Sequence, residues 1–258
     1  MPEREAGGVK VALFIPCYVD QLAPEVGLAT ATVLERLGCT VSFDPRQTCC
    51  GQPFISTGAR AEAVRLARAH AANFAHAEAV VCPSASCVAT VRRRYAELLG
   101  AEPAAELAAR TFELAEFIVS RLGTCDVGAH FPHRVALLES CHGLRELGLG
   151  QPTEQLGGDP SLLGVTERLL RGVAGLELRP IARRDECCGF GGAFSVGFPE
   201  LSARIGRDRL RALAESGAEY VTGTDASCLL HLDALRRREG FGPRAIHLAE
   251  ILARGAPG

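Results

Sequence analysis

The chain has 258 residues, of which 47% are hydrophobic and 22% are charged, and its formal net charge is −2. This profile is typical of a globular protein with room for two modest domains, and it excludes a disordered or fibrous chain. The weak charge gives no reason to expect nucleic acid as a partner. No apolar stretch reaches the ~18 residues of a membrane helix and no signal peptide is evident, so we expect a cytoplasmic protein without a membrane span.

Short apolar segments alternate with helical patterns along the first half of the chain. We expect strands at 9–15, 40–43 and 79–82, and helices at 22–37, 60–74, 87–99 and 111–122. The segment 123–133 contains Gly and Pro without periodicity and is the expected join between the halves.

The second half repeats this order of elements. We expect strands at 134–138, 176–178 and 219–222, and helices at 162–170, 200–214, 227–238 and 247–252. Alternating strands and helices predict a parallel sheet covered on both faces. The expected fold class is therefore α/β, with two pseudo-symmetric Rossmann-like lobes, one domain in 1–124 and the other in 134–258.

Cysteine is abundant, at eleven residues, and eight of these cysteines fall into a pattern that both halves share. Each half has a cysteine after its first strand, an adjacent pair before Gly, and a cysteine at the start of a late helix. All follow predicted strands, whose carboxyl ends gather ligands in folds of this kind. The two sets are Cys17, Cys49, Cys50 and Cys87 in the first half, and Cys141, Cys187, Cys188 and Cys228 in the second.

Four thiolates suit either a cubane iron–sulfur cluster or a structural zinc ion. Adjacent residues in extended backbone point apart, which favours an extended cluster over one small tetrahedral ion. Gly51 and Gly189 would let the backbone turn close to the cluster and offer amide donors to its sulfurs. A zinc-stabilised scaffold and a thiol–disulfide reductase remain as alternatives. Three cysteines have no counterpart in the other half, and we interpret them as packing residues: Cys39, Cys82 and Cys125.

The order Cys, Cys-Cys-Gly, Cys resembles the CCG cysteine-rich domain. That domain occurs twice in lactate utilization A proteins, in the glycolate oxidase iron–sulfur subunit and in one of the subunits of heterodisulfide reductase. The likeness is strongest to the lactate utilization A family and covers nearly the whole chain. The residues that carry it are 11–20, 47–53, 140–145, 187–196 and 247–252.

This resemblance implies the iron–sulfur subunit of a cytoplasmic redox system that oxidises L-lactate to pyruvate. It implies one [4Fe-4S] cluster in each lobe, and as partners an iron–sulfur protein B and a protein C of the same system. It leaves the electron acceptor open. No flavin or nicotinamide motif is present, so hydride chemistry on a 2-hydroxy acid would need a partner subunit.

One departure from the heterodisulfide reductase motif concerns its terminal C-x-x-C. The first position of that pair is Ser84 in one half and Asp225 in the other, so a fifth thiolate is missing from both sites. This disfavours the non-cubane clusters and the disulfide-reducing activity of that relative. Asp225 could still ligate an iron or set its potential through charge, or it could cap the helix that begins near Ser227.

Two histidines lie close in sequence to the second cysteine set. His142 directly follows Cys141, which places an imidazole at the rim of the site, able to move protons or to hydrogen-bond sulfur. A loop histidine satisfied by backbone groups is the alternative interpretation. His231, one helical turn after Cys228, is a candidate for the same role.

Overall fold

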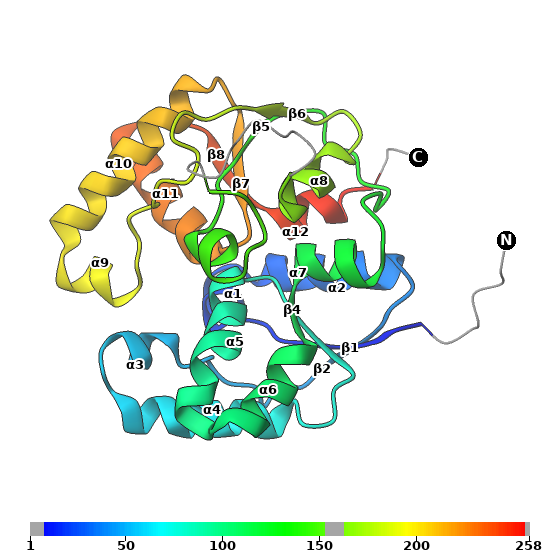
Figure 1. Ribbon diagram of the computed structural model, residues 1–258. Helices are drawn as coiled ribbons and strands as arrows, with labels where there is room; N and C mark the ends of the chain where they lie inside the picture. The colour runs from blue at the N-terminus through cyan, green and yellow to red at the C-terminus, as the bar shows by residue number, and fades with distance from the viewer. Residues whose placement is uncertain (1–7, 153–162, 256–258) are drawn as a thin grey trace, which may run out of the picture.

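The computed structural model describes residues 8–152 and 163–255. They form two α/β lobes, each built on a four-stranded parallel sheet (Figure 1). The strands are β1 (Lys10–Leu13), β2 (Thr40–Phe43), β3 (Ala79–Cys82), β4 (Thr111–Glu113), β5 (Arg134–Leu137), β6 (Glu177–Arg179), β7 (Tyr220–Gly223) and β8 (Arg244–His247). Their order is β2-β1-β3-β4 in the first lobe and β6-β5-β7-β8 in the second, so the predicted fold class and pseudo-symmetry are confirmed.

Helices cover both faces of each sheet. The first lobe contains α1 (Cys17–Leu22), α2 (Pro24–Arg36), α3 (Gln52–Ser56), α4 (Arg60–Asn73), α5 (Ala85–Leu99), α6 (Ala101–Arg110), α7 (Leu114–Glu116) and the π-helical turn η1 (Phe117–Arg121). The second contains the π-helical turn η2 (His142–Glu146), α8 (Val165–Arg171), α9 (Ala193–Gly197), α10 (Pro199–Glu215), α11 (Ala226–Glu239) and α12 (Leu248–Ala253). Among the helices of the described ranges, none is both long and apolar enough to cross a membrane.

The clearest correction to the sequence analysis concerns 111–122, for which we expected one helix. Thr111–Glu113 is instead the edge strand β4, paired in parallel with β3 through Val80 and Thr111. Glu113 then starts α7, because its carboxylate accepts hydrogen bonds from the backbone N–H groups of Ala115 and Glu116 at 2.7 and 3.2 Å. Sheet pairing thus overrides the helical pattern at the start of this segment.

The second lobe repeats this feature where we expected a helix at 247–252. Arg244–His247 forms the edge strand β8 beside β7, and α12 begins one residue later than expected. His247 accepts a hydrogen bond from the N–H of Ala249 at 3.1 Å, which places it where Glu113 stands in the first lobe. Of the helix expected at 162–170, residue Leu162 lies outside the described residues and α8 begins at Val165.

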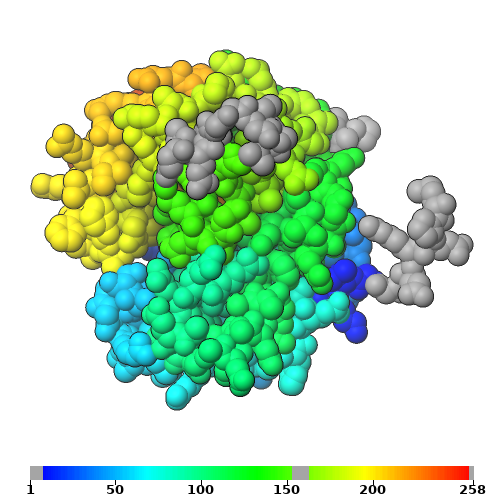
Figure 2. All heavy atoms as spheres, in the orientation of Figure 1, coloured from blue at the N-terminus to red at the C-terminus, as the bar shows by residue number. Residues whose placement is uncertain are grey.

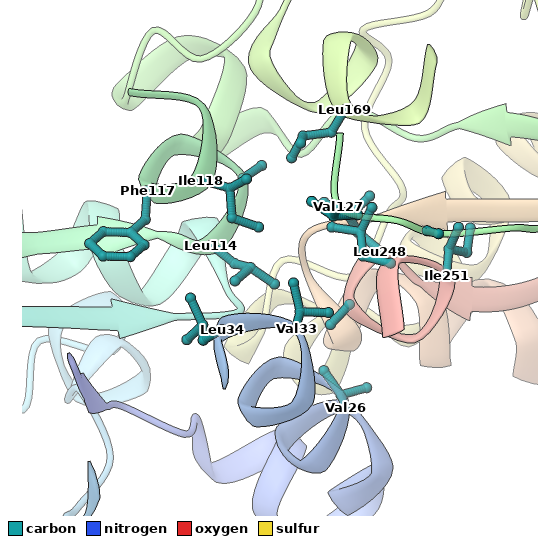
Figure 3. Close-up of a cluster of buried hydrophobic side chains, with 14 of the residues drawn as sticks. Val26, Val33, Leu34, Leu114, Phe117, Ile118, Val127, Leu169, Leu248 and Ile251 are labelled. Atoms are coloured by element: carbon teal, nitrogen blue, oxygen red, sulfur yellow. The ribbon is translucent and has the colours of Figure 1, made fainter. Parts of the chain in front are cut away.

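The two lobes share one apolar core. In β1, Val11 and Leu13 point into this central core, whereas Phe14, just past the strand, packs on the outer face of the first lobe. Figure 3 shows side chains of α2, α7 and η1 meeting those of α8 and α12 in the centre. The space-filling view shows the cyan atoms of the first lobe in contact with the green and yellow atoms of the second (Figure 2).

Arg36, the last residue of α2, adds polar contacts between the lobes. Its guanidinium donates hydrogen bonds to the carbonyls of Leu252 at 3.0 Å and Val127 at 3.3 Å, and also to that of Ala253. Two of these carbonyls lie in the last turn of α12, which lacks partners within its own helix. The two lobes are therefore joined by both apolar packing and directed hydrogen bonds.

Because the core is shared, we expect a cavity in it to destabilise both lobes together. Leu248→Ala removes a fully buried side chain of α12 and should lower the free energy of unfolding by about 2–5 kcal/mol, in a single urea transition. Leu28→Ala on α2 is the control, since Leu28 is 71% exposed and its loss should change stability by less than about 0.5 kcal/mol. Two separate transitions in the Leu248→Ala protein would show that the lobes fold independently.

Candidate metal centre

The structure brings the eight repeated cysteines to the carboxyl ends of the strands, as predicted. They line two neighbouring cavities at the interface between the lobes, of about 220 and 180 Å³. Both cavities are also lined by Gln52 and Pro53 of α3 and by Phe190 of the glycine-rich loop. Figure 1 shows α3 of the first lobe and α9 of the second at the same edge of the molecule, one on each side of this interface. The first cavity holds Cys17, Cys49, Cys50 and Cys87, and the second holds Cys141, Cys187, Cys188 and Cys228.

The thiols of the first site meet in pairs. The sulfur of Cys17, at the start of α1, lies 3.7 Å from that of Cys49, and the sulfur of Cys50 lies 3.5 Å from that of Cys87 in the first turn of α5. The adjacent Cys49 and Cys50 therefore approach different partners. The thiols of Cys49 and Cys50 also interact with each other, however, so the full divergence that we expected of neighbouring residues is not seen.

The second site has a similar arrangement with more exposure. The sulfurs of Cys188 and Cys228 are 2.8 Å apart. In each adjacent pair the second cysteine is buried, whereas Cys187 and Cys141 are exposed to solvent. The second site is thus the more open of the two.

The glycine after each cysteine pair forms the same turn in both lobes. Gly51 and Gly189 have φ angles of 86° and 90°, in the left-handed region that favours glycine. Their N–H groups donate to the sulfurs of Cys49 and Cys187 at 3.4 and 3.3 Å. Backbone donors of this kind stabilise charge on sulfur, which is the role that we expected of these glycines.

Crowding makes the ionisation of these thiols mutually dependent. The hydrogen bond from Cys17 raises its own pKa and lowers the pKa of Cys49. In the second site, the hydrogen bond with Cys188 and burial raise the pKa of Cys187. Within residues 8–152 and 163–255, no three Cys, His, Asp or Glu side chains converge on one point that could hold a single ion. Close thiols around a cavity suit a bound metal ion or cluster, whose positive charge would let them ionise.

Asp225 links the two sites across the interface between the lobes. Its Oδ1 accepts hydrogen bonds from the hydroxyls of Ser84 and Ser86, both at 2.7 Å, and from the N–H of Ser86 at 3.1 Å. Its Oδ2 accepts from the hydroxyl of Ser140, the residue before Cys141. One buried carboxylate therefore joins the segments that carry cysteines of both lobes.

These contacts correct one interpretation of Asp225. It occupies the N-cap position of α11, but its side chain makes no hydrogen bond to that helix. It binds instead at the N-terminus of α5 in the other lobe, because the lobe interface brings that helix end within reach. Ser84, its counterpart, is buried and accepts a hydrogen bond from the N–H of Cys87 at 3.4 Å. The two positions that lack the fifth cysteine thus contact each other directly.

The two candidate histidines have different surroundings. His142 lines the second cavity, with Nδ1 3.6 Å from the sulfur of Cys141 and Nε2 3.0 Å from the amide nitrogen of Gln52. It therefore lies at the rim, as expected. His231 is not among the described residues that line this cavity. It packs near the ring of Phe190, at 6.0 Å between centroids, and burial lowers its pKa.

Sequence reasoning missed the contact that Cys82 makes with the first site. Its thiol, fully buried at the end of β3, interacts with that of Cys87. The position of Cys82 at the end of a strand could have indicated this contact. Cys82 has no repeated counterpart in the second half, however, so it was not grouped with the other cysteines of the site. Tyr95 of α5 was also missed, and its hydroxyl donates to the carbonyl of Cys50 at 3.0 Å. Cys39 and Cys125 pack in or against the central core, as predicted.

Two α/β lobes, each with four thiols at the carboxyl edge of its sheet, define a duplicated cysteine-site protein. The family model described as "Cysteine-rich domain" (CCG) matches residues 11–92 and 135–233. The chain belongs to this CCG cysteine-rich domain family, and within it to the lactate utilization A proteins.

Three relatives show how similar this chain is to the lactate utilization A proteins. "Lactate utilization protein A" of an Exiguobacterium species is 40% identical, covering 95% of this chain and 97% of its own. The proteins of the same name from Geobacillus kaustophilus and Oceanobacillus iheyensis are 39% and 35% identical, covering 95% of this chain and 98% and 96% of their own. An aspartate racemase homologue of known structure from Pyrococcus horikoshii aligns over 95% of each chain at 14% identity and a TM-score of 0.31, too low for any inference.

The two glycine turns provide a matched pair of variants. A Cβ at Gly189 would lie 2.5 Å from the carbonyl oxygen of Ser202 and 2.8 Å from the nitrogen of Gly206, so α10 would have to move. A Cβ at Gly51 meets nothing closer than 3.7 Å and suffers only the unfavourable φ. We expect Gly51→Ala to lower the free energy of unfolding by about 1–3 kcal/mol and Gly189→Ala to lower it further, as measured by urea unfolding. Equal losses of stability in the two variants would show that α10 moves without lowering the free energy of unfolding.

Asp225→Asn tests the network between the lobes. All of its partners at Oδ1 and Oδ2 donate hydrogen bonds to a charged carboxylate. In Asn one accepting oxygen becomes a donating amide, so the serine hydroxyls must reorient and the charge-assisted hydrogen bonds are lost. The free energy of unfolding should fall by about 1–3 kcal/mol. Asp126→Asn is the control, because Asp126 is an exposed residue of the join whose carboxylate, among the residues that the structure describes, accepts only from the N–H of Gly128. Identical stabilities of the two variants would show that the network does not stabilise the fold.

Proposed function

We propose that this chain is the iron–sulfur subunit of a cytoplasmic redox system that oxidises L-lactate to pyruvate. In this proposal one [4Fe-4S] cluster is held in each CCG domain, the first within 1–124 and the second within 134–258, and transfers electrons. The observation that carries the proposal is the repeated set of four thiols around a cavity at the carboxyl edge of each sheet. The names of the curated relatives supply the link to lactate.

The residues present fit such a cluster in three respects. Each lobe offers four thiols, which is the number of ligands that a cubane takes. The N–H groups of Gly51 and Gly189 point at sulfur, and a buried cysteine in each pair is shielded from water. When bound, a cluster would supply one-electron redox chemistry. The protein would hold it through Cys17, Cys49, Cys50 and Cys87 in one lobe, and Cys141, Cys187, Cys188 and Cys228 in the other.

Around these ligands the chain's own residues have separate tasks in the proposal. Asp225 and Ser84 fix the helix ends that carry Cys87 and Cys228 relative to each other. His142 can accept or donate a proton at the rim of the second site. Because hydride removal from a 2-hydroxy acid needs a cofactor that no motif here provides, the proposed partners are the iron–sulfur protein B and the protein C of the same system.

A second candidate function is thiol–disulfide reduction. The observation in its favour is Cys49, a half-buried thiol whose pKa is lowered by the hydrogen bond from Cys17, so that it would be nucleophilic in the metal-free protein. Alkylation of metal-free protein would detect one hyper-reactive thiol.

Wild-type protein purified anaerobically with iron and acid-labile sulfide would favour the cluster, whereas stoichiometric zinc without sulfide would favour a zinc-stabilised scaffold.

We expect Cys50→Ser and Cys188→Ser each to remove the cluster of one lobe only. Iron and acid-labile sulfide, assayed after anaerobic purification, should fall by about half in each variant, because each ligand set lies within one repeat. Cys39→Ser is the control, since Cys39 packs in the central core away from both cavities. Loss of all iron from either variant, with a normal urea transition, would replace two clusters with one shared centre.

A further inference from the structure

A fifth thiol is buried beside the first cysteine site. Cys82 is the last residue of β3, and all four residues of this strand are buried. Side chains alternate along a strand, so Val81 packs in the central core, whereas Val80 and Cys82 pack on the outer face of the first lobe. Cys82 is 0% exposed, and it is not among the described residues that line the first cavity.

Two of the four proposed ligands pack on this same outer face. Cys50 and Cys87 belong to one buried cluster with Cys82. The sulfurs of Cys50 and Cys87 are 3.5 Å apart, and the thiol of Cys82 interacts with that of Cys87. Because Cys87 lines the cavity and Cys82 does not, Cys82 lies one thiol deeper in the lobe.

The short turn between β3 and α5 keeps Cys82 and Cys87 close together. The strand ends at Cys82 and the helix begins at Ala85. Ser84, the N-cap residue of α5, accepts a hydrogen bond from the N–H of Cys87 at 3.4 Å and donates one to Asp225 at 2.7 Å. The first turn of the helix is thereby fixed at the end of the strand.

The second lobe has no such thiol and no room for one. The repeat that matches Cys87 with Cys228 matches Cys82 with Gly223, at the same interval along the chain. A Cβ at Gly223 would lie 2.7 Å from the carbonyl oxygen of Leu138, so the backbone after β5 would have to move. The described residues thus place five close thiols at the first site and four at the second.

We propose that Cys82 is an additional metal ligand of the first site, which takes over the iron that Cys87 releases. This inference rests on the proposed function. In the exchange, the bond between iron and the Cys87 sulfur breaks and a bond to the Cys82 sulfur forms. The proton of the Cys82 thiol passes to the Cys87 sulfur, so the number of thiolate ligands and the net charge are unchanged and no oxidant or reductant is needed. The first site therefore tolerates the loss of its helix cysteine, and the second site does not.

Matched variants in the two lobes provide the first test. Cys87→Ala and Cys228→Ala each remove the helix cysteine of one site, and alanine, unlike serine, has no oxygen that could bind iron. After anaerobic purification, Cys87→Ala should keep the iron and acid-labile sulfide content of the wild-type protein, whereas Cys228→Ala should lose about half. Loss of half the iron from Cys87→Ala would overturn the inference. Full retention in both variants would also overturn it, because three thiols would then suffice.

The second test removes Cys82 itself. Cys82→Ala alone should keep the full iron content, because the four thiols that line the cavity remain, but combined with Cys87→Ala it should lose about half. The control combines Cys39→Ala with Cys87→Ala. Cys39 is another buried thiol but packs in the central core, so this protein should contain as much iron as Cys87→Ala alone. Equal iron contents in the two double variants would contradict a ligand role for Cys82.

Two further measurements separate a folding defect from the loss of a ligand. The urea transition of each purified variant reports whether the chain is folded. Cys82→Val fills the strand position with an apolar side chain that has no thiol, and it replaces Cys82→Ala if the smaller side chain unfolds the protein. Absence of iron and sulfide from the wild-type protein would defeat the proposed function, whereas loss from Cys87→Ala in a loaded wild-type background would defeat only this inference.

Discussion

Packing of the two lobes on a common apolar core is the constraint on which the other features of this protein depend. Parallel sheets need cover on both faces, and here each lobe supplies part of the cover for the other. The contact between α2 and α12, reinforced by Arg36, sets the angle at which the lobes meet. The carboxyl edges of both sheets consequently open on the same interface, and the two cysteine sites become neighbours.

The polar contacts at this interface follow from the same arrangement. A carboxylate buried between lobes must find donors, and Asp225 finds them in three serines that adjoin cysteines of both halves. The position where a relative has a fifth cysteine is thus used in this chain to join the sites rather than to enlarge either one. Movement of one site relative to the other would break hydrogen bonds to a buried charge, so their separation is fixed by the fold.

Duplication of the cysteine sets has not made the lobes identical. Cys82 stands beside Cys87 in the first lobe, and the equivalent position in the second lobe is Gly223. The second site is also the more exposed of the two. The two sets of cysteines thus match in type and order, whereas their surroundings differ.

The sequence by itself determined the repeat, the alternation of strands and helices, and the eight cysteines that line the two cavities. Periodicity and spacing are local properties, and carboxyl ends of parallel strands converge by geometry alone. The sequence did not reveal β4 and β8. These short edge strands form through pairing with β3 and β7, and their own residues show little hydrophobic periodicity. Only the tertiary structure decided what Asp225 and Tyr95 contact. Their partners lie in the other lobe or in distant strands and loops. The packing of the two halves on one core brings these partners close, and the spacing of residues along the sequence does not predict which ones meet.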